Sequence, residues 1–300
     1  MAALADPDRS ELDALWVGAL GGDPGPLERR LAESSRLPGP RANLELAAHF
    51  ADLVGATADD RRGSAVGLLD DWLTGRMSSP GLPEGGEEFL AACAALAAGS
   101  VAAGSVAAGS VAAGSASDAT DRLLTAAAGD GRWRVREMAA TGMQRVLRAD
   151  WNSGLRAVRN WLRSGDALEA RAAVAAVAEP PLLKDAGHAA EAVAVVEDAV
   201  DLLLATPAGR RADDDVRVLR KAMGYAVSVV AVAHPDSGLP LLERLATSTD
   251  TDARWIARQN LTKARLSPFA DRLTVAREAA ARTSAPPSAP PSKAAGLSRP

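Results

Sequence analysis

Apolar residues recur along this chain with the period of one helix face. The clearest stripe, with members three or four positions apart, runs through Val135, Met138, Ala139, Gly142, Met143, Val146 and Leu147. Similar stripes occupy residues 121–130, 151–162, 167–178, 190–205, 215–233, 238–246 and 252–266. Alternating runs rich in Val, Ile and Thr, which would indicate strands, are absent. The sequence therefore predicts an all-α protein in which helix pairs joined by short turns form a repeat array.

The first 95 residues predict an N-terminal helical block. Short helices are expected in residues 11–20, 27–37, 42–54 and 59–75, with Asn43 as a possible N-cap of the third. The punctuation between them, GGDPGP and PGPR, suits a helix end followed by a turn. Residues 76–86 are predicted to form a loop.

A low-complexity segment follows the block. Residues 96–115 are four copies of a pentad, one LAAGS and three VAAGS. A period of five fits neither a helix face nor a strand, and each glycine disfavours helix by roughly 1 kcal/mol. We interpret residues 96–117 as a linker that arose from an expanded coding repeat, in which the alanines can still give partial helix. A functional flexible hinge is the alternative interpretation.

The helix pairs themselves are predicted for residues 118–282. Beyond them, residues 283–300 read TSAPPSAPPSKAAGLSRP. A segment dominated by Pro, Ser and Ala cannot bury enough surface to offset the entropy of ordering it, so this tail is predicted to be disordered. A proline-rich ligand for an SH3-like partner is the alternative interpretation of the tail.

Composition narrows the classes of function. Aromatic residues make up 3% of the chain, so Ala, Leu and Val must form most of the core. A net charge of −4 gives no overall attraction to DNA or to an anionic membrane, and any nucleic-acid contact would need a local basic patch. The single cysteine, Cys93, cannot form an intrachain disulfide and is predicted to be buried.

We expect the protein to be soluble and cytoplasmic. The N-terminus, MAALADPDRSELDALW, carries early acidic residues and no positive region, unlike a signal peptide. No membrane-spanning helix is expected, because the best apolar candidate, residues 192–205, is interrupted by three carboxylates. His49, His188 and His234 lie far apart in the sequence, so neither a metal site nor a cofactor is predicted.

An aspartate and an arginine recur at a nearly fixed spacing of five or six residues. The pairs are Asp130 with Arg136, Asp166 with Arg171, Asp214 with Arg220, and Asp252 with Arg258. Successive arginines lie 35, 49 and 38 residues apart, close to the length of one helix pair. An aspartate at a helix start accepts from free backbone N–H groups, and the arginine can reach the aspartate of an adjacent repeat. We predict that these residues form a structural ladder that fixes the register of stacked repeats.

Residues 130–147, DGRWRVREMAATGMQRVL, resemble the second helix of a HEAT-type repeat, whose pattern is Asp, several residues, Val-Arg and then small apolar residues. Residues 21–52, 169–183 and 255–266 resemble segments of a group of bacterial HEAT-repeat proteins. The resemblance implies an α-solenoid of HEAT-like helix pairs without a settled activity. More distantly, the chain resembles the HEAT-like DNA alkylation-repair solenoids, whose glycosylase members use an acidic residue and aromatic side chains in a basic concave groove. No residue here is matched to their catalytic aspartate.

Two tryptophans, each three residues before a ladder arginine, mark candidate partner-binding positions. In a functional interpretation they contact a partner together with nearby cations, by stacking and phosphate contacts if the partner is a nucleic acid. The candidate set is Trp133, Arg134, Trp255, Lys263 and Arg265. In a structural interpretation, each indole packs under the preceding helix and the neighbouring arginine belongs to the ladder.

No catalytic motif is present in the sequence: it lacks a glycine-rich phosphate loop, a Gly-x-Ser-x-Gly elbow and a Cys-x-x-Cys pair. The three aspartates at 213–215 fit a helix start better than a magnesium site. We therefore predict a non-enzymatic scaffold that binds a macromolecular partner, a protein before a nucleic acid, on the concave face of a HEAT-like array. The alternative is a nucleic-acid-binding or DNA-repair-related protein of the alkylation-repair type.

Overall fold

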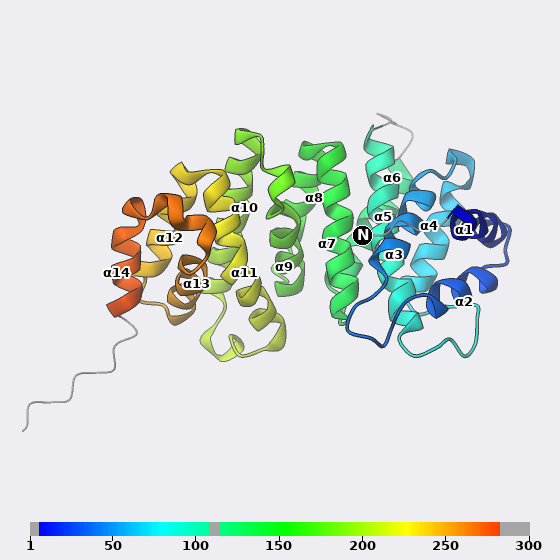
Figure 1. Ribbon diagram of the computed structural model, residues 1–300, viewed down its shortest axis with the longest axis horizontal. Coiled ribbons are helices and arrows are strands. Elements are labelled where there is room, and N and C mark those ends of the chain that lie inside the picture. Colours follow the sequence, from blue (N-terminus) through cyan, green and yellow to red (C-terminus); the bar gives the residue numbers. More distant parts are fainter. Residues whose placement is uncertain (1–5, 108–113, 283–300) are drawn as a thin grey trace, which may run out of the picture.

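The computed structural model describes residues 6–107 and 114–282 of the chain (Figure 1). These residues form α-helices and short 3₁₀ turns joined by loops, and they contain no β-strand. The all-α prediction is therefore confirmed for the described residues. The helices lie side by side along the long axis of the molecule, from α1 and α2 at one end to α14 at the other (Figure 1). The tail predicted at residues 283–300 lies outside the described residues.

The first four helices fall within a few residues of the predicted segments: α1 (Asp6–Leu20), α2 (Gly25–Glu33), α3 (Leu44–Gly55) and α4 (Asp59–Leu73). Asn43 is the N-cap of α3, and its side-chain oxygen accepts from the Leu46 N–H at 3.2 Å. Aromatic rings fill the space between these helices: Phe50 meets Trp16 edge-on and lies 5.5 Å from the Trp72 ring. This part of the chain therefore has an aromatic core despite the low aromatic content of the whole.

A buried carboxylate ties the loop that follows α4 to this core. Glu28 of α2 is fully buried and accepts hydrogen bonds from Trp72 Nε1 and from the backbone N–H groups of Ser78 and Ser79, at 2.9, 3.0 and 2.7 Å. Three donors compensate the cost of removing the carboxylate from water. The loop predicted at residues 76–86 is thus held in one position ahead of the next helix.

The linker predicted at residues 96–117 is wrong for residues 96–107. These residues continue the helix α5 (Gly86–Ala107), which packs against α3 and α4 as well as against later helices and is largely buried. The apolar pattern did not indicate this part of α5, because its residues are small on every side of the helix. A helix that is surrounded by other helices needs no single apolar face. Burial and close packing outweigh the poor helix propensity of glycine. Part of the pentad segment, residues 108–113, lies outside the described residues.

Helix α5 also corrects the expectation that no segment is long and apolar enough to span a membrane. Residues 89–117 carry no charged side chain, and α5 has the length and hydropathy of a spanning helix. However, 83% of its most apolar window is buried inside the protein, which is the situation of a core helix. Cys93 lies on this helix and is fully buried, as predicted.

The later helices follow the predicted segments closely, except for the first and the last. They are α6 (Gly114–Ala128), α7 (Trp133–Ala149), α8 (Trp151–Arg163), α9 (Ala167–Val177), α10 (Ala186–Ala205), α11 (Asp214–Ala233), α12 (Pro235–Thr247), α13 (Thr251–Leu261) and α14 (Thr274–Arg282). Helix α6 begins at Gly114, well before the predicted start at residue 121, so the predicted linker is also wrong for residues 114–117. The sequence pattern did not indicate α14, because its buried residues, Ala276 and Ala279, are small and offer a weak apolar signal.

The helices pack in two layers. In layer A, each of α3, α5, α7, α9, α11 and α13 contacts the next. In layer B, α4 contacts α6. Further along, α8 contacts α10, α10 contacts α12, and α12 contacts α14. From α6 onward, each helix of layer B is followed along the chain by its neighbour in layer A, so that α6–α7, α8–α9, α10–α11 and α12–α13 are successive pairs.

One hydrophobic cluster extends through both predicted regions of the chain. It includes Leu12 of α1 and Ala279 of α14 and is continuous through α5, which contacts α2, α3 and α4 on one side and α6 and α7 on the other. No break in the core therefore accompanies the boundary predicted at residue 95.

Candidate interaction surface

One arginine–aspartate pair of the predicted ladder joins adjacent helix pairs. Arg220 of α11 donates from Nη1 to the carboxylate of Asp252 in α13 at 2.6 Å. Asp252 is almost fully buried, and its carboxylate also accepts a hydrogen bond from Arg211 Nη1 at 3.4 Å. Arg211 donates in addition to the carboxylate of Asp250, the N-cap of α13. Two arginines from the α11 side and two aspartates from the α13 side thus form one network between two adjacent helix pairs.

Asn260 adds a second link between the same two helices. It is fully buried on α13, donates from Nδ2 to the Met223 carbonyl of α11 at 2.9 Å and accepts from the Ser228 N–H at 2.8 Å. An amide that satisfies both a donor and an acceptor of a neighbouring helix fixes the register of the two helices.

The other three ladder arginines do not pair with a ladder aspartate of an adjacent helix pair. Arg171 of α9 pairs with Glu137 of α7, which also joins adjacent helix pairs but does not involve a ladder aspartate. Arg136 is buried and donates to the backbone carbonyl of Asp130, within its own segment. Arg258 is half-buried and makes no ion pair with another described residue.

The other three ladder aspartates do not reach an arginine of another helix pair. Asp166 is the N-cap of α9 and accepts from the first backbone N–H groups of that helix. Asp214 is exposed in the first turn of α11, where 98% of its side-chain surface is accessible. Asp130 bonds Arg132 at 2.7 Å; burial acts to raise the pKa of Asp130, but the Arg132 hydrogen bonds and charge outweigh it, so the pKa is lowered. Local donors have taken the place of the predicted inter-repeat arginine at these positions.

Trp133 stands at the start of α7 with 53% of its surface exposed, so its indole does not pack under the preceding helix. The guanidinium carbon of Arg134 lies 4.6 Å from the ring centroid. Arg134 is itself held by Glu88 of α5 at 3.1 Å. The tryptophan therefore presents an exposed ring whose orientation a neighbouring ion pair supports.

Trp255 has a different environment. It is half-buried on α13, with the guanidinium carbon of Arg220 5.0 Å from its ring centroid. On α11 its indole lies against Gly224, where an added Cβ would be 3.1 Å from the ring. Trp255 therefore contributes to the packing of α13 on α11.

Lys263 and Arg265 both lie near the ring of Tyr225, a residue that the sequence pattern did not indicate. Tyr225 of α11 is 51% exposed, and the Arg265 guanidinium carbon and Lys263 Nζ lie 4.5 and 6.0 Å from its ring centroid. Neither cation makes an ion pair with another described residue. The sequence held a signal for this site, since Tyr225 is the single tyrosine of the chain and lies four residues after Lys221 on the same helix.

A cleft of about 620 Å³ opens between α3, α5 and α7; we call it the α3–α7 cleft. Leu44, 57% exposed, and Trp133 both line it, together with half-buried Met138. Arg36 and Arg41, from the loop before α3, also line the cleft and are exposed cations without an ion pair to another described residue. The cleft thus combines apolar walls with unpaired positive charge.

A second hollow of about 350 Å³ lies among α7, α9 and α11, and Trp133 lines it as well; we call it the α7–α11 hollow. Three cations, Arg136, Arg171 and Lys221, line it with one carboxylate, Glu137, which Arg171 already engages. Burial, together with the nearby charge of Arg171, lowers the pKa of Arg136. This crowding of positive charge favours an anion in the hollow.

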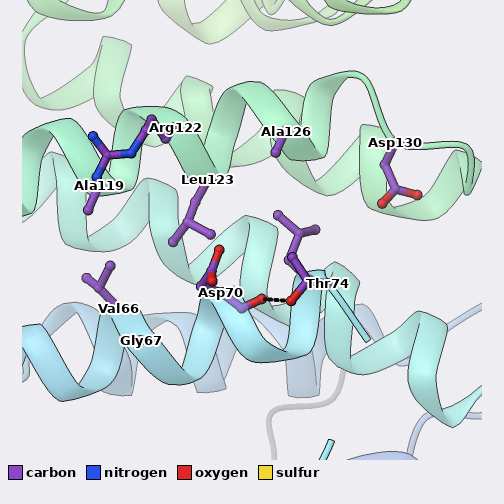
Figure 2. A pocket seen from close by; sticks show the side chains of 10 residues that line it. Val66, Gly67, Asp70, Thr74, Ala119, Arg122, Leu123, Ala126 and Asp130 are labelled. Carbon is purple, nitrogen blue, oxygen red and sulfur yellow. Dashed lines mark hydrogen bonds between the residues drawn. The ribbon is translucent and has the colours of Figure 1, made fainter. Parts of the chain in front are cut away.

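A third hollow, of about 550 Å³ between α4 and α6, has a different character (Figure 2). Its acidic groups are already paired, Asp70 with Arg76 at 2.6 Å and Asp130 with Arg132 at 2.7 Å. The Thr74 hydroxyl donates to the Asp70 carbonyl at 2.7 Å, as Figure 2 shows. Because its carboxylates are already paired within the chain, we assign this hollow no binding role.

Within residues 6–107 and 114–282, no three His, Cys, Asp or Glu side chains gather as a metal ion would need. Two of the three histidines have other contacts. His188 stacks on Trp151 with a centroid distance of 4.2 Å, and His234 Nδ1 lies 2.7 Å from the Ser237 hydroxyl.

No protein-family model matches the chain, and no curated protein matches it. Among solved structures, the crystal structure of an engineered protein is similar at 19% sequence identity, over 78% of this chain and 94% of that chain, with a TM-score of 0.31. A likeness this weak carries no argument about function. The structure therefore defines an all-helical protein, whose paired helices are consistent with a helical repeat fold.

Proposed function

We propose that the chain is a non-enzymatic, HEAT-like solenoid scaffold that binds another protein through layer A. The proposed repeat is a helix pair whose second helix lies in layer A. Stacked pairs of this kind offer one long surface made by a single row of helices. The similarity of residues 130–147 to the second helix of a HEAT repeat supports the assignment of α7 to that row. We also propose a cytoplasmic location, because a single cysteine offers no intrachain disulfide.

The observation that carries the proposal is the position of the exposed apolar side chains. Five large apolar side chains are exposed among the described residues, and three of them lie on layer A: Leu44, Trp133 and Tyr225. A single exposed apolar residue needs no explanation, but these three lie on α3, α7 and α11 of one layer. Leu44 and Trp133 line the α3–α7 cleft, Trp133 also lines the α7–α11 hollow, and Tyr225 lies on α11, whose residues Lys221 and Ala222 line that hollow. Aromatic anchors next to concave, water-accessible hollows are typical of protein interfaces.

Site-specific photo-crosslinking tests this function. A benzoylphenylalanine replaces Trp133 or Tyr225 in the full chain and, as a control, Asn152, an exposed residue of α8 in layer B. In an extract of the source cells, the proposal expects a discrete protein adduct from the two layer A positions and none from position 152. Equal labelling from all three positions, or no adduct at all, contradicts a protein partner on layer A.

A nucleic-acid-binding role is the second candidate, because cations lie over exposed aromatic rings. Arg134 lies at Trp133, and Lys263 and Arg265 lie at Tyr225. Rings and cations together bind bases and phosphates in single-strand-binding proteins. For a single-stranded oligonucleotide, this role requires log affinity to fall with log salt with a slope of about −0.7 per neutralised phosphate. An affinity that is flat in salt, or unchanged by Tyr225→Ala, removes the candidate.

A further inference from the structure

We propose that one acidic protein segment occupies both hollows of layer A, with a bulky apolar side chain in the α3–α7 cleft and a carboxylate in the α7–α11 hollow. This inference rests on the proposed function, that layer A binds a protein, and it specifies the chemistry of the partner.

The α3–α7 cleft suits an apolar side chain. Leu44 and Trp133 are 57% and 53% exposed, and both border the same space of about 620 Å³. Buried Phe89 and half-buried Met138 extend the apolar lining into the protein. An aromatic or leucyl side chain placed there would remove apolar surface of both molecules from water, which is how a central anchor residue contributes to an interface.

The α7–α11 hollow suits a carboxylate. Lys221 is exposed and has no ion pair with another described residue. Arg171 uses one nitrogen for Glu137, but its Nη1 is buried and has no hydrogen-bond partner among the described residues. Buried arginine donors are costly when unpaired, and an arriving carboxylate would accept from Arg171 and Lys221 together.

Trp133 lines both hollows, so the two sites share a wall and can take side chains from one short segment. Six cationic side chains line the hollows, three in each, whereas the carboxylates that line them are those of Glu45 and Glu137 alone. This local positive excess contrasts with the net charge of −4 of the chain. Charge complementarity therefore favours an acidic partner.

Two other occupants fit the same surface less well. The C-terminal segment of this chain, residues 283–300, carries Lys293 and Arg299 and no acidic residue, so it has the wrong charge. For a nucleic acid, the cleft offers apolar walls where sugars and phosphates would lie, and the guanidinium group of Arg134 already covers one face of the Trp133 ring. An acidic peptide with an apolar residue matches both hollows.

The experiment is the selection of a random-peptide library, displayed on phage, against the immobilised full-length chain. The expected result is a consensus that places Asp or Glu close to Leu, Phe or Trp. A selected peptide is then synthesised with a fluorescent label, and its affinity for the chain is measured by anisotropy. Lys221→Glu should weaken that affinity by roughly tenfold or more, and Trp133→Ala should also weaken it, because each removes one side of the site.

The matched control is Lys184→Glu. Lys184 is exposed, lies in the loop before α10 and has no ion pair with another described residue, so the variant carries the same change of charge away from both hollows. It should bind the peptide as the unaltered chain does. Equal circular dichroism and melting temperatures of the three variants and the unaltered chain separate loss of binding from loss of fold.

Several results overturn the inference. In the selection, these are no enrichment of phage over the bare support, or a basic or uncharged consensus. In the anisotropy measurement, they are equal affinity of Lys221→Glu and Lys184→Glu for the peptide, or displacement of the peptide by a single-stranded oligonucleotide that binds more tightly. The photo-crosslinking experiment distinguishes the two levels of failure. A protein adduct at Trp133, together with a peptide selection that gives no acidic consensus, contradicts this inference alone. The absence of any adduct contradicts the proposed function.

Discussion

Gly99 of α5 and Gly142 of α7 face each other so closely that neither position has room for a side chain. A Cβ at Gly99 would lie 2.3 Å from the Gly142 Cα, and a Cβ at Gly142 would lie 2.9 Å from the Ala95 carbonyl oxygen. Glycine is needed here because of a backbone approach and not because of a turn. The first pentad of the repeated segment therefore sets how closely α5 and α7 pack.

We expect Gly99→Ala to destabilise the protein by about 1–3 kcal/mol, because the added methyl group must push α5 away from α7. The gain in helix propensity, of about 1 kcal/mol or less, offsets only part of this cost. Gly104→Ala is the control, since its Cβ would meet its nearest neighbour, the Gly55 carbonyl oxygen, at an ordinary 3.5 Å. Urea unfolding should show Gly104→Ala as neutral or stabilising; equal stability of the two variants would contradict the close contact.

Glu28→Ala should cost about 3 kcal/mol or more of stability. The change leaves the Trp72 indole N–H and the backbone N–H groups of Ser78 and Ser79 without their acceptor in a buried place. Glu33→Ala, at an exposed position on the same helix, should change stability by less than about 0.5 kcal/mol. Chemical unfolding of both variants measures the difference, and a small effect at Glu28 would mean that water replaces the carboxylate.

Asp250→Asn should reduce the acid sensitivity of the fold. Burial acts to raise the pKa of Asp250, but hydrogen bonds from Arg211 and from the Ala253 and Asp252 N–H groups outweigh it, so the pKa is lowered below 3.8. A lowered folded-state pKa gives stability that is present above the unfolded pKa and is lost as pH falls through the folded pKa. At pH 7 the variant should therefore be less stable by about 1 kcal/mol, since asparagine keeps the cap but not the charge.

The measurement for Asp250 is urea unfolding between neutral pH and about pH 2, where the curves of variant and unaltered chain should converge as the carboxyl group protonates. Asp214→Asn is the control, because the Asp214 side chain is almost fully exposed at the start of α11. It should shift stability little at any pH. If the difference in free energy of unfolding between Asp250→Asn and the unaltered chain stayed constant over the whole pH range, the effect would not be electrostatic.

Cys93 should be inert in the native protein. Burial raises the pKa of its thiol, so the reactive thiolate is scarce at neutral and mildly basic pH. A chromogenic disulfide reagent should leave the folded chain unmodified and should titrate one thiol after denaturation in guanidinium. Reaction of the folded chain at the rate of a free thiol would place Cys93 on the surface.

The helical class and most helix positions could be predicted from the sequence, because a helix packed on one side leaves a stripe of period 3.6. Asn43 was also predictable as an N-cap, since its role depends on a residue three positions away. Helix α5 could not be predicted in this way. Its Ala, Gly and Ser residues look alike on every side, and only the surrounding helices decide that residues 96–107 are buried.

The candidate surface was predictable only in part. Trp133 and Arg134 were identified, but Leu44 and Lys221 were not, because their exposure depends on which neighbours cover them. The partner of Arg171 depends on the rotation of α9, which brings Glu137 of α7 into reach and leaves Asp166 to cap its own helix. Spacing along one chain contains no information on such rotations.

Helix α5 contacts α2, α3 and α4 as well as α6 and α7, so neither half of the molecule can lose its structure without exposing a large apolar surface of the other. Arrays in which each unit touches only its neighbours can melt piecewise. Here α5 joins α2, α3 and α4 to α6 and α7, and one hydrophobic cluster continues from there to α14. We therefore expect one heat-absorption peak in scanning calorimetry, with equal calorimetric and van't Hoff enthalpies. A proteolytic cut within α5 would accordingly unfold both halves.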